Sequence, residues 1–583
     1  MPERPLLAIR MSRWSIGSTL AWGIAWGLAW GFALLAPEIV RTHYMSGTHS
    51  EAIRIALVLA AIFIVLGAGI ALGLYLIVAI VRARAASPGV SIGIAMPVVY
   101  VGLGALIYFA KFRTIGGAHW YSRAAMLALL LAAAGTAAIA IVHFLVRRKP
   151  PVEKSSILLG TILVVFSMSA FSLLIRFPAP NRAAKTAHAL GHLPQSQGSK
   201  RPLLVIAIDG GTWHSIEPLL RQRRLPAFAS IIDSGIHGDV KALWPPYWSV
   251  AAWGAIVTGH PREDVGVFGD VNVKVPGLPV FQSPLELEPA LVPITAIEYV
   301  LASRRMIHSK IPDRTALRRP PIWEMLDRSG IKTAVVRFNF TYPATRQAAI
   351  VVSNLAMADV WGLVGVRIPD SAGLVEPSSR REELLAPFAR EWTGDSTEFA
   401  RVFPQKKWPK PKDAAINPVG ILRGVLHFDA ATIVTASRLM HTDPDIRVLF
   451  AHLGGVDNVG HSFWQYRFPN EFRYRPDPRD IRALGPVMDR YLEFIDAGIQ
   501  RMIDAFPERP NVLIVSDHGQ AAREDGVPFK GWHASPGIFL AAGPDIAHDS
   551  ERLDVSYYDI APTILDLERL AKPPDLRGRS LLK

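Results

Sequence analysis

The sequence contains no cysteine among its 583 residues. The absence of thiols excludes disulfide bonds and thiolate metal sites, so any metal ion must be bound by histidine and carboxylate side chains. It also removes cysteine content as a guide to the cellular compartment, which has to be inferred from the placement of apolar segments instead.

Acidic residues are scarce in the first 175 positions, where 4 Asp and Glu stand against 14 Lys and Arg. This excess of 10 accounts for most of the net charge of +14 and leaves +4 for the remaining 408 residues. Loops that face anionic lipid explain such a bias. The near-neutral second part lacks the basic surface of a nucleic-acid-binding protein, so we exclude nucleic acid as a partner.

Long stretches without any charged residue dominate the same N-terminal part. Each is about 20 residues or longer, which is the length that an α-helix needs to cross a membrane. A cleaved signal peptide would have a shorter apolar core and no further spans behind it. We therefore expect an all-α bundle of five transmembrane helices within residues 1–176, embedded in the lipid bilayer. The predicted spans are residues 15–35, 55–81, 91–110, 124–146 and 156–175.

The short loops between these spans differ in their basic content. Nine Lys and Arg lie on the side that holds the N-terminus, and five lie on the other side. The positive-inside rule then places the N-terminus in the cytoplasm, for a protein of the plasma or inner membrane. Because the number of spans is odd, the chain after residue 175 is predicted to lie on the extracytoplasmic or periplasmic side.

The first span repeats Ala-Trp-Gly, which places Gly23, Gly27 and Gly31 four residues apart on one helix face. Glycines at this spacing let a second helix backbone approach closely. We interpret them first as packing positions within the five-helix bundle. The alternative is a helix-mediated oligomer of this chain.

Residues 177–200 are polar, contain proline and show no regular period, which is typical of a linker. Beyond them, short apolar runs alternate with helical patterns and predict parallel strands with crossover helices. We expect residues 201–583 to form one α/β domain, a three-layer αβα sandwich. The stretch 271–440 is expected to continue the sheet and to supply a cap or insertion. Predicted strands include residues 203–208, 334–338, 447–453 and 511–516.

Carboxylates and histidines follow these predicted strands, where functional residues of parallel sheets gather. Asp457 and His461 would share one face of a helix, because they are four residues apart. Singly, each residue has an ordinary explanation, such as a helix N-cap, a turn aspartate or a surface histidine. Together, three aspartates and three histidines form a ligand set for two Zn²⁺-like ions. They are Asp209, Asp457, His461, Asp517, His518 and His533.

Five motifs occur in a fixed order through this domain. They are Asp209-Gly210, a serine four residues before Trp253 and Thr258-Gly259, Asp457-x-x-x-His461, Ser516-Asp517-His518-Gly519, and Gly531-x-His533 followed by Gly-x-Phe and Gly-Pro. In this order they resemble the type I phosphodiesterase/nucleotide pyrophosphatase branch of the alkaline phosphatase superfamily. The resemblance spans residues 201–583 and implies an alkaline-phosphatase-like sandwich and a metal-dependent phosphoester hydrolase.

The resemblance also implies a role for each site residue. The family's nucleophile corresponds to Ser249, for which a helix N-cap is the ordinary alternative. Metal coordination would activate its hydroxyl, and two successive displacements would retain the configuration at phosphorus. Zn²⁺ is the expected metal, with Mn²⁺ and Mg²⁺ as alternatives. One ion would be bound by Asp209, Ser249, Asp517 and His518, and the other by Asp457, His461 and His533.

Two departures from the family pattern concern the substrate side of the site. Residues 265–267 read Val-Gly-Val where relatives carry His-Gly-Ile, and the family asparagine that contacts a phosphate oxygen has no clear counterpart. Asp270 and Asn272 both fall near its place. A carboxylate there would repel phosphate, so Asn272 is the preferred phosphate contact. The segment after Ser249 lacks the Pro and Arg of sulfatase motifs, which argues against sulfate esters.

Three functions from different classes fit this pattern. We favour a phosphodiesterase or phosphatase that acts on a lipid-linked or envelope-associated phosphoester at the extracytoplasmic membrane face. The second is a membrane transferase of a phosphoryl headgroup, similar to the phosphoethanolamine and glycerophosphate transferases. Against it, the sulfatase-like motifs of those proteins are missing. The third is a non-catalytic sensor or scaffold, against which the complete ligand set argues. His214, His260 and His452 lie near the motifs and are left outside the predicted ligand set.

Overall fold

The computed structural model describes Ile24 and most of residues 201–582. Within that range it leaves out 244–246, 268, 271, 275–280, 283–307, 311, 345–346, 358–370, 390–396, 405–406, 410–416 and 524–529. By internal contacts the chain divides into two units, residues 1–181 with 274–307, and residues 182–273 with 308–583. In the first unit the structure describes Ile24, Lys274 and strand β4 (Phe281–Gln282). All that follows concerns the second unit.

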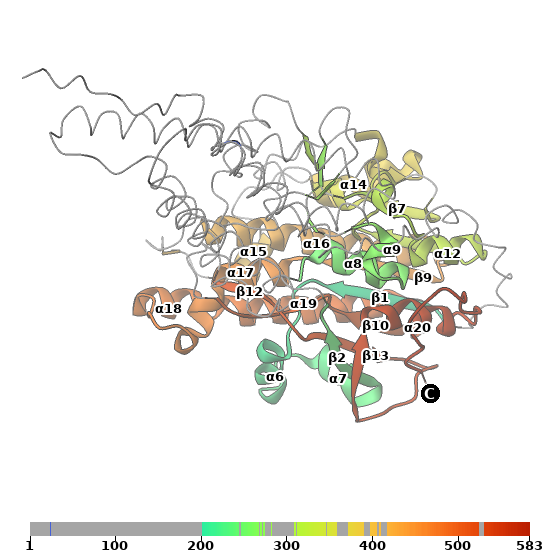
Figure 1. Ribbon diagram of the computed structural model, residues 1–583. Helices are drawn as coiled ribbons and strands as arrows, with labels where there is room; N and C mark the ends of the chain where they lie inside the picture. The colour runs from blue at the N-terminus through green and yellow to red at the C-terminus, as the bar shows by residue number, and fades with distance from the viewer. Residues whose placement is uncertain are drawn as a thin grey trace, which may run out of the picture. The chain divides into compact units, whose positions relative to one another are not determined.

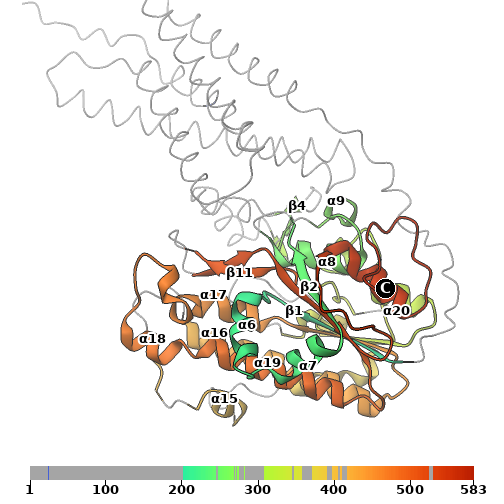
Figure 2. The same ribbon diagram turned by 90° about the horizontal axis from the view of Figure 1, so that it is seen from below.

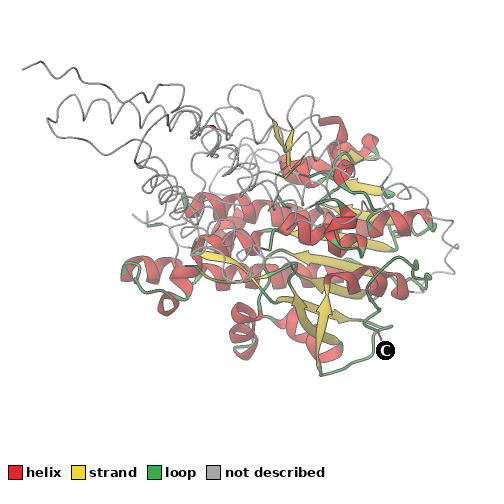
Figure 3. Cartoon of the chain, in the orientation of Figure 1, coloured by secondary structure: helices red, strands yellow, loops and turns green. Residues whose placement is uncertain are grey.

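A mixed β-sheet forms the centre of this unit (Figure 3). Its strands are β1 (Leu203–Ile208), β2 (Ile236–Lys241), β6 (Thr333–Val336), β7 (Ile350–Val352), β8 (Val375–Glu376), β9 (Val448–Leu453), β10 (Asn511–Val515), β13 (Gly537–Ala542) and β14 (Arg552–Ser556). Among the described residues, these nine strands pair in the order β14-β2-β13-β10-β1-β9-β6-β7-β8. β10, β1, β9, β6 and β7 run parallel to one another. β13 runs antiparallel to both β10 and β2, and β8 antiparallel to β7.

Helices cover both faces of the sheet (Figures 1 and 2). On one face, the buried core includes residues of α6 (Trp213–Arg221), α7 (Pro226–Ser234), α14 (Arg381–Ala389), α15 (Thr397–Val402), α16 (Pro418–Thr442), α17 (Gly455–Arg467), α18 (Pro478–Leu484) and α19 (Val487–Asp504). On the other face, it includes residues of α8 (Ser249–Thr258), α9 (Arg262–Val265), α12 (Ile322–Arg328) and α20 (Ile560–Leu567). The unit is therefore a three-layer αβα arrangement, as the sequence predicts.

The central strands are apolar along their whole length because both of their faces are buried. In β1, Leu204 and Ile206 point into one core, whereas Leu203 and Val205 point into the other. Successive side chains of a strand point to opposite faces, so a strand between two helical layers needs apolar residues at every position. This requirement is what makes residues 203–208 recognisable as a strand in the sequence.

Two smaller sheets accompany the main one. β11 (Gly519–Ala522) and β12 (Gly531–Ala534) form an antiparallel ribbon that leaves the end of β10. β3 (Asn272–Lys274) and β5 (His308–Lys310) are neighbours in a second small sheet. The ribbon lies against α17, because a Cβ on Gly531 would meet the backbone of Gly460.

The four predicted strands correspond to β1, β6, β9 and β10, and they run parallel as expected. The whole sheet is mixed, because β13 returns beside β10 in the opposite direction. The chain between these two strands forms the β11–β12 ribbon and contains no crossover helix in its described part, 516–523 and 530–536. An antiparallel neighbour can be reached without such a crossover, whereas a parallel one cannot.

Several sequence predictions lie outside the described residues and stay predictions. They include the five spans, the glycines Gly23, Gly27 and Gly31, and the linker 177–200. Within 271–440, the described parts contribute β6, β7 and β8 to the sheet and α12, α14 and α16 to its faces. In the described part of the chain, α16 is the one helix long and apolar enough to cross a membrane. However, 61% of its most apolar stretch is buried, as in the core helix of a folded domain.

Candidate metal centre

The predicted site residues follow the strands at the middle of the sheet. β1 lies between β10 and β9, and Ala207 near its end is in parallel register with both neighbours. Asp209 follows β1, Asp517 and His518 follow β10, and α17 begins two residues after β9. Parallel strands end at the same edge of a sheet, so residues that are far apart in the sequence meet there.

Gly210 allows α17 to approach the end of β1. Its φ is +72°, and a Cβ at this position would lie 2.8 Å from both Cα and Cβ of Asp457. Glycine adopts this left-handed backbone without steric cost and leaves the space that Asp457 needs. The dipeptide Asp209-Gly210 therefore places two carboxylates of the site next to each other.

The first set of convergent donors, the α17 group, comprises Asp457, His461 and His533. His461 Nε2 lies 3.2 Å from Asp457 Oδ1 and 3.0 Å from His533 Nε2. Asp457 and His461 stand one turn apart on α17, on the shared face that the sequence predicts for a helix. His461 Nδ1 donates to the carbonyl of Gly531 at 2.7 Å, which leaves the Nε2 lone pair directed at the group.

The second set, the β1 group, comprises Asp209, Asp517 and His518. His518 Nε2 lies 3.4 Å from Asp209 Oδ1 and 3.4 Å from Asp517 Oδ2. Its Nδ1 donates to the carbonyl of Gly519 at 2.9 Å, which again leaves Nε2 facing the carboxylates. Among the described residues, the buried Asp517 Oδ2 has no hydrogen-bond donor. A cation would satisfy this oxygen, so the residues present fit a metal ion.

The two groups form one centre. The imidazole rings of His518 and His533 stack with their centroids 3.9 Å apart and their planes 25° apart. In each group the donor atoms lie within 4.8 Å of one another. Carboxylate oxygens and imidazole nitrogens are the donors that Zn²⁺ accepts in a protein without cysteine.

The buried ionisable groups of the centre perturb one another strongly. Burial, followed by repulsion from Asp209, raises the pKa of Asp517 well above its usual value. Burial disfavours the charged imidazole of His518, yet attraction to Asp517 raises the pKa of His518 to about 10. Burial and then repulsion by His518 hold the pKa of His533 well below its usual value. Positive charge beside the buried carboxylates would reduce their mutual repulsion, and divalent cations supply such charge.

Ser249 is the first residue of α8, and its side chain points into the β1 group. Its hydroxyl donates to Asp209 Oδ1 at 3.2 Å, and Oγ lies 3.0 Å from His518 Nε2. The N-cap of α8 is Trp248, whose side chain makes no capping hydrogen bond. The ordinary explanation of Ser249 as an N-cap is therefore wrong.

Asp270 is the residue that the described structure places against the start of α8. Its Oδ1 accepts a hydrogen bond from the backbone amide of Val250 at 2.8 Å. Burial, opposed by this hydrogen bond and reinforced by repulsion from Asp209, raises the pKa of Asp270 to about 7. Asn272 begins β3, but its side chain is outside the described part of the structure. Its contact with phosphate stays a prediction.

Three further neighbours of the aspartates lie outside the predicted ligand set. Trp253 Nε1 donates to Asp209 Oδ2 at 3.2 Å, and His452 Nε2 lies 3.6 Å from the same oxygen. Gln520 Nε2 donates to Asp457 Oδ1 at 2.8 Å. The position of His452 at the end of a predicted strand was a signal for it. The sequence contains no signal for the contact of Gln520 with Asp457, because this contact depends on how the β11–β12 ribbon folds over α17.

His214 and His260, also left outside the predicted ligand set, have partners elsewhere. His214 Nε2 lies 2.7 Å from Glu471 Oε1, and its ring stacks on Trp464. The buried His260 lies 3.3 Å from Asp575 Oδ2. Neither is in the α17 group or the β1 group.

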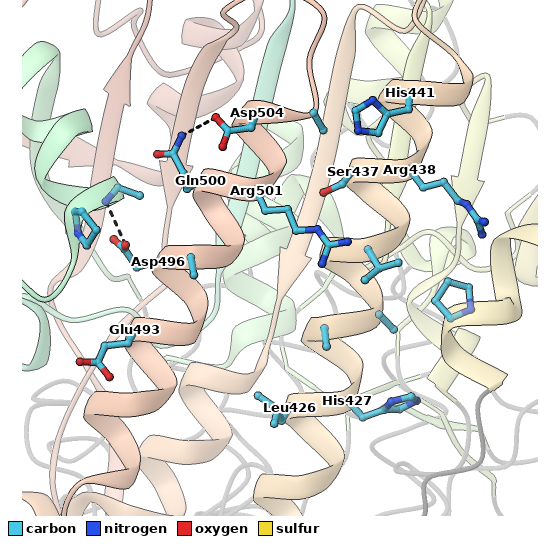
Figure 4. Close-up of a pocket in the computed structure, with 18 of the residues that line it drawn as sticks. Leu426, His427, Ser437, Arg438, His441, Glu493, Asp496, Gln500, Arg501 and Asp504 are labelled. Carbon is cyan, nitrogen blue, oxygen red and sulfur yellow. Dashed lines mark hydrogen bonds between the residues drawn. The ribbon is translucent and has the colours of Figure 1, made fainter. Parts of the chain in front are cut away.

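A groove of about 1420 Å³ lies between α16 and α19 (Figure 4). Its described lining includes Leu426 and His427 on α16 and Gln500 and Arg501 on α19. Ser249 and the members of the two donor groups are not among its described lining residues. The groove is therefore separate from the candidate metal centre.

Comparison with known proteins supports this description. A family model described as Type I phosphodiesterase / nucleotide pyrophosphatase matches residues 203–564. The 2,3-bisphosphoglycerate-independent phosphoglycerate mutase of Chloroflexus aggregans is 36% identical over 105 residues, which cover 17% of this chain and 19% of that protein. That of Desulforudis audaxviator is 38% identical over 95 residues, which cover 16% and 18%. This chain thus spans about a fifth of the length of these relatives.

Solved structures are similar at low identity. Murine ectonucleotide pyrophosphatase / phosphodiesterase 5, in complex with AMP, is 12% identical with a TM-score of 0.36, over 65% of this chain and 97% of that chain. At this identity and overlap, the likeness says nothing about the substrate of this chain.

The sheet, the two donor groups and the family match define a class: the chain has the fold and the donor set of the metal-dependent phosphoester hydrolases of the alkaline phosphatase superfamily. Members of this class depend on divalent metal ions. Within it, the chain belongs to the type I phosphodiesterase / nucleotide pyrophosphatase family, whose model covers more than half of the sequence. The family resemblance seen in the sequence is confirmed, and the N-terminal membrane domain stays a prediction.

Proposed function

We propose that this protein is a phosphodiesterase of the nucleotide pyrophosphatase type that uses Ser249 as its nucleophile. The observation that carries the proposal is the position of Ser249 Oγ, 3.2 Å from Asp209 Oδ1 and 3.0 Å from His518 Nε2. A serine hydroxyl becomes a competent nucleophile when cations and bases of this kind surround it.

Two divalent ions, for which Zn²⁺ fits the donors best and Mn²⁺ or Mg²⁺ are alternatives, would occupy the centre. The β1 group with Ser249 would hold one ion, and the α17 group would hold the other. When bound, the ions would lower the pKa of the serine hydroxyl and neutralise charge on the phosphate oxygens.

The protein's own residues then set the course of the reaction. Ser249 gives up its hydroxyl proton to solvent, and its Oγ forms a bond to phosphorus while the bond to the ester oxygen on the opposite side breaks. The leaving oxygen takes the electron pair, gains a proton and departs as the alcohol. Water then attacks the phosphoserine from the vacated side, and Ser249 is regenerated. α8 begins at Ser249, so the positive end of its dipole faces the transferred phosphate. Two inversions give net retention at phosphorus.

The sequence supports a place for this chemistry at a membrane. With five spans and a cytoplasmic N-terminus, the hydrolase domain would lie on the extracytoplasmic face, beside phosphoesters carried on lipids or envelope glycans. A reporter phosphatase that is active only outside the cytoplasm, fused after residue 175, should be active. Activity of the same reporter fused after residue 90, on the predicted cytoplasmic side, would contradict this orientation.

The central experiment uses the full chain in detergent micelles. Bound metal is measured first, and then turnover of p-nitrophenyl phosphate, bis(p-nitrophenyl) phosphate and p-nitrophenyl sulfate. We expect the diester to be hydrolysed, with a loss of at least about a thousandfold in Ser249→Ala. The control is Ser234→Ala, because Ser234 is a partly exposed serine whose hydroxyl donates to a backbone carbonyl of its own helix.

The outcomes separate hydrolysis from its alternatives. If the Ser249→Ala variant still hydrolyses the diester, Ser249 is not the nucleophile. Headgroup transfer between membrane lipids or glycans, seen by thin-layer analysis with negligible attack by water, would replace hydrolysis by a transferase reaction. Metal binding without turnover of any of these esters would favour a non-catalytic role for this protein.

A further inference from the structure

The start of α8 is already in contact with an anion from the protein itself. The first backbone amides of a helix have no partner within the helix and carry partial positive charge, so they are natural binding points for phosphate oxygens. In this protein the amide of Val250, the residue after Ser249, donates to Asp270 Oδ1 at 2.8 Å. A carboxylate therefore stands beside the proposed nucleophile, at a point where a substrate oxygen would otherwise be stabilised.

Asp270 adds negative charge to a centre that is otherwise balanced. Two divalent ions carry four positive charges, and Asp209, Asp457, Asp517 and a deprotonated Ser249 carry four negative ones. Among the described residues, the ion pairs of these three aspartates are with histidines. The excess negative charge of Asp270 would act on any phosphoester that reaches Ser249.

We propose that Asp270 is a specificity-determining residue that makes the site discriminate phosphoesters by charge, so that singly charged esters are favoured over doubly charged ones. Coulomb repulsion grows with the charge of the ligand. A phosphodiester carries one negative charge, whereas a monoester carries close to two above about pH 7. This inference rests on the proposed function, because it assigns the substrate phosphate to the Ser249 site.

Asp270→Asn separates this role from a purely structural one. The asparagine side-chain oxygen can still accept the hydrogen bond from Val250, but the negative charge is removed. If Asp270 only caps α8, the asparagine variant should leave ligand selectivity unchanged. Asp477→Asn is the matched control, because Asp477 accepts from the first-turn amide of Arg479 at 2.7 Å at the start of another helix, α18.

The test measures binding as well as turnover. Affinities for phenyl phosphate and diphenyl phosphate are determined by calorimetry on the full, zinc-loaded chain with Ser249→Ala, at about pH 8.5, where the monoester is doubly charged. With Asp270 present, we expect the diester to bind more tightly relative to the monoester. Asp270→Asn should improve monoester affinity about tenfold and change diester affinity by less than about threefold. Asp477→Asn should change neither.

The same comparison is made for kcat/KM with p-nitrophenyl phosphate and bis(p-nitrophenyl) phosphate, in the chain that retains Ser249. Asp270→Ser, which is also neutral and smaller, provides a second variant if the asparagine protein unfolds. An unchanged monoester-to-diester affinity ratio in the neutral variants, or no binding of either ester, would overturn the role of Asp270. Charge-selective binding without any turnover would instead overturn the proposed function and leave the inference standing.

Discussion

The carboxylate of Asp429 on α16 accepts hydrogen bonds from the backbone amides of Gly454 and Gly455, at 3.2 and 3.0 Å, and thereby holds the start of α17. Tyr491 donates its hydroxyl proton to the same carboxylate at 2.9 Å. A side chain on Gly455 would collide with this hydroxyl, so the close approach requires glycine. The first turn of α17 carries Asp457. The buried hydrogen bonds of Asp429 therefore help to hold Asp457 in its position in the metal centre.

Removal of the Asp429 carboxylate should weaken both the fold and the centre. The buried Arg337 lies 3.6 Å from Asp429 Oδ1 and would lose its anionic partner. A buried charge left without its partner typically costs about 3 kcal/mol or more of stability. We expect Asp429→Ala to lower the thermal unfolding midpoint of the metal-loaded protein and to weaken zinc binding, measured by chelator competition. The control is Asp445→Ala, whose partner Lys332 is at the surface. Equal effects of the two substitutions would contradict this account.

Two glycines with left-handed backbones allow the cost of backbone strain to be measured separately from the cost of a steric clash. Gly210 has φ +72°, and its added Cβ would lie 2.8 Å from Asp457, whereas Gly330 has φ +80° and open space around the same position. Gly330→Ala should therefore lose only the free energy of placing a side chain in the left-handed conformation, about 1–2 kcal/mol of stability. Gly210→Ala should lose several times more and should abolish metal-dependent turnover. Calorimetric unfolding and diester assays check this, and similar behaviour of the two variants would show that Asp457 has room to move.

Metal removal should destabilise the hydrolase domain, because ions that bind only the folded protein stabilise it by mass action. At a free ion concentration about 100 times the dissociation constant, the gain is about 2.7 kcal/mol per site. We expect EDTA to lower the unfolding midpoint and Zn²⁺ to restore it. His461→Ala should reduce the zinc-induced shift, and His214→Ala, which changes a histidine paired with Glu471, should keep it. An unfolding midpoint that does not respond to EDTA would argue against bound ions.

The sequence predicts the centre of the fold better than its edges, for a physical reason. β1, β9 and β10 are buried on both faces, so their apolar runs are continuous and easily recognised. β14 at the sheet edge and β2 beside it contain polar and charged residues and give a weaker signal. The antiparallel direction of β13 depends on the path of the β11–β12 ribbon, which no local pattern encodes.

The candidate site shows the same division between local and long-range information. Asp209 and Asp517 could be named because they follow recognisable strands, and His461 because it lies one helical turn from Asp457. The preference for Asn272 over Asp270 came from the chemistry of the two side chains alone. Which side chain reaches α8 depends on the course of the chain between α9 and β3, and the structure places Asp270 against Val250.

Glu568 should make the stability of the protein depend on pH. This carboxyl is 1% exposed, and burial, only partly offset by Arg447, raises its pKa from 4.5 to about 7. Between these values the folded chain keeps a proton that the unfolded chain has lost, so stability falls as pH rises from about 4.5 to 7. Glu568→Gln removes this titration, so its stability relative to the unmodified protein should rise by about 3 kcal/mol across that range. Unfolding midpoints at several pH values measure the difference, with Glu551→Gln at the surface as control. If the difference in unfolding midpoint between Glu568→Gln and the unmodified protein does not change with pH, Glu568 is not the group that titrates in this range.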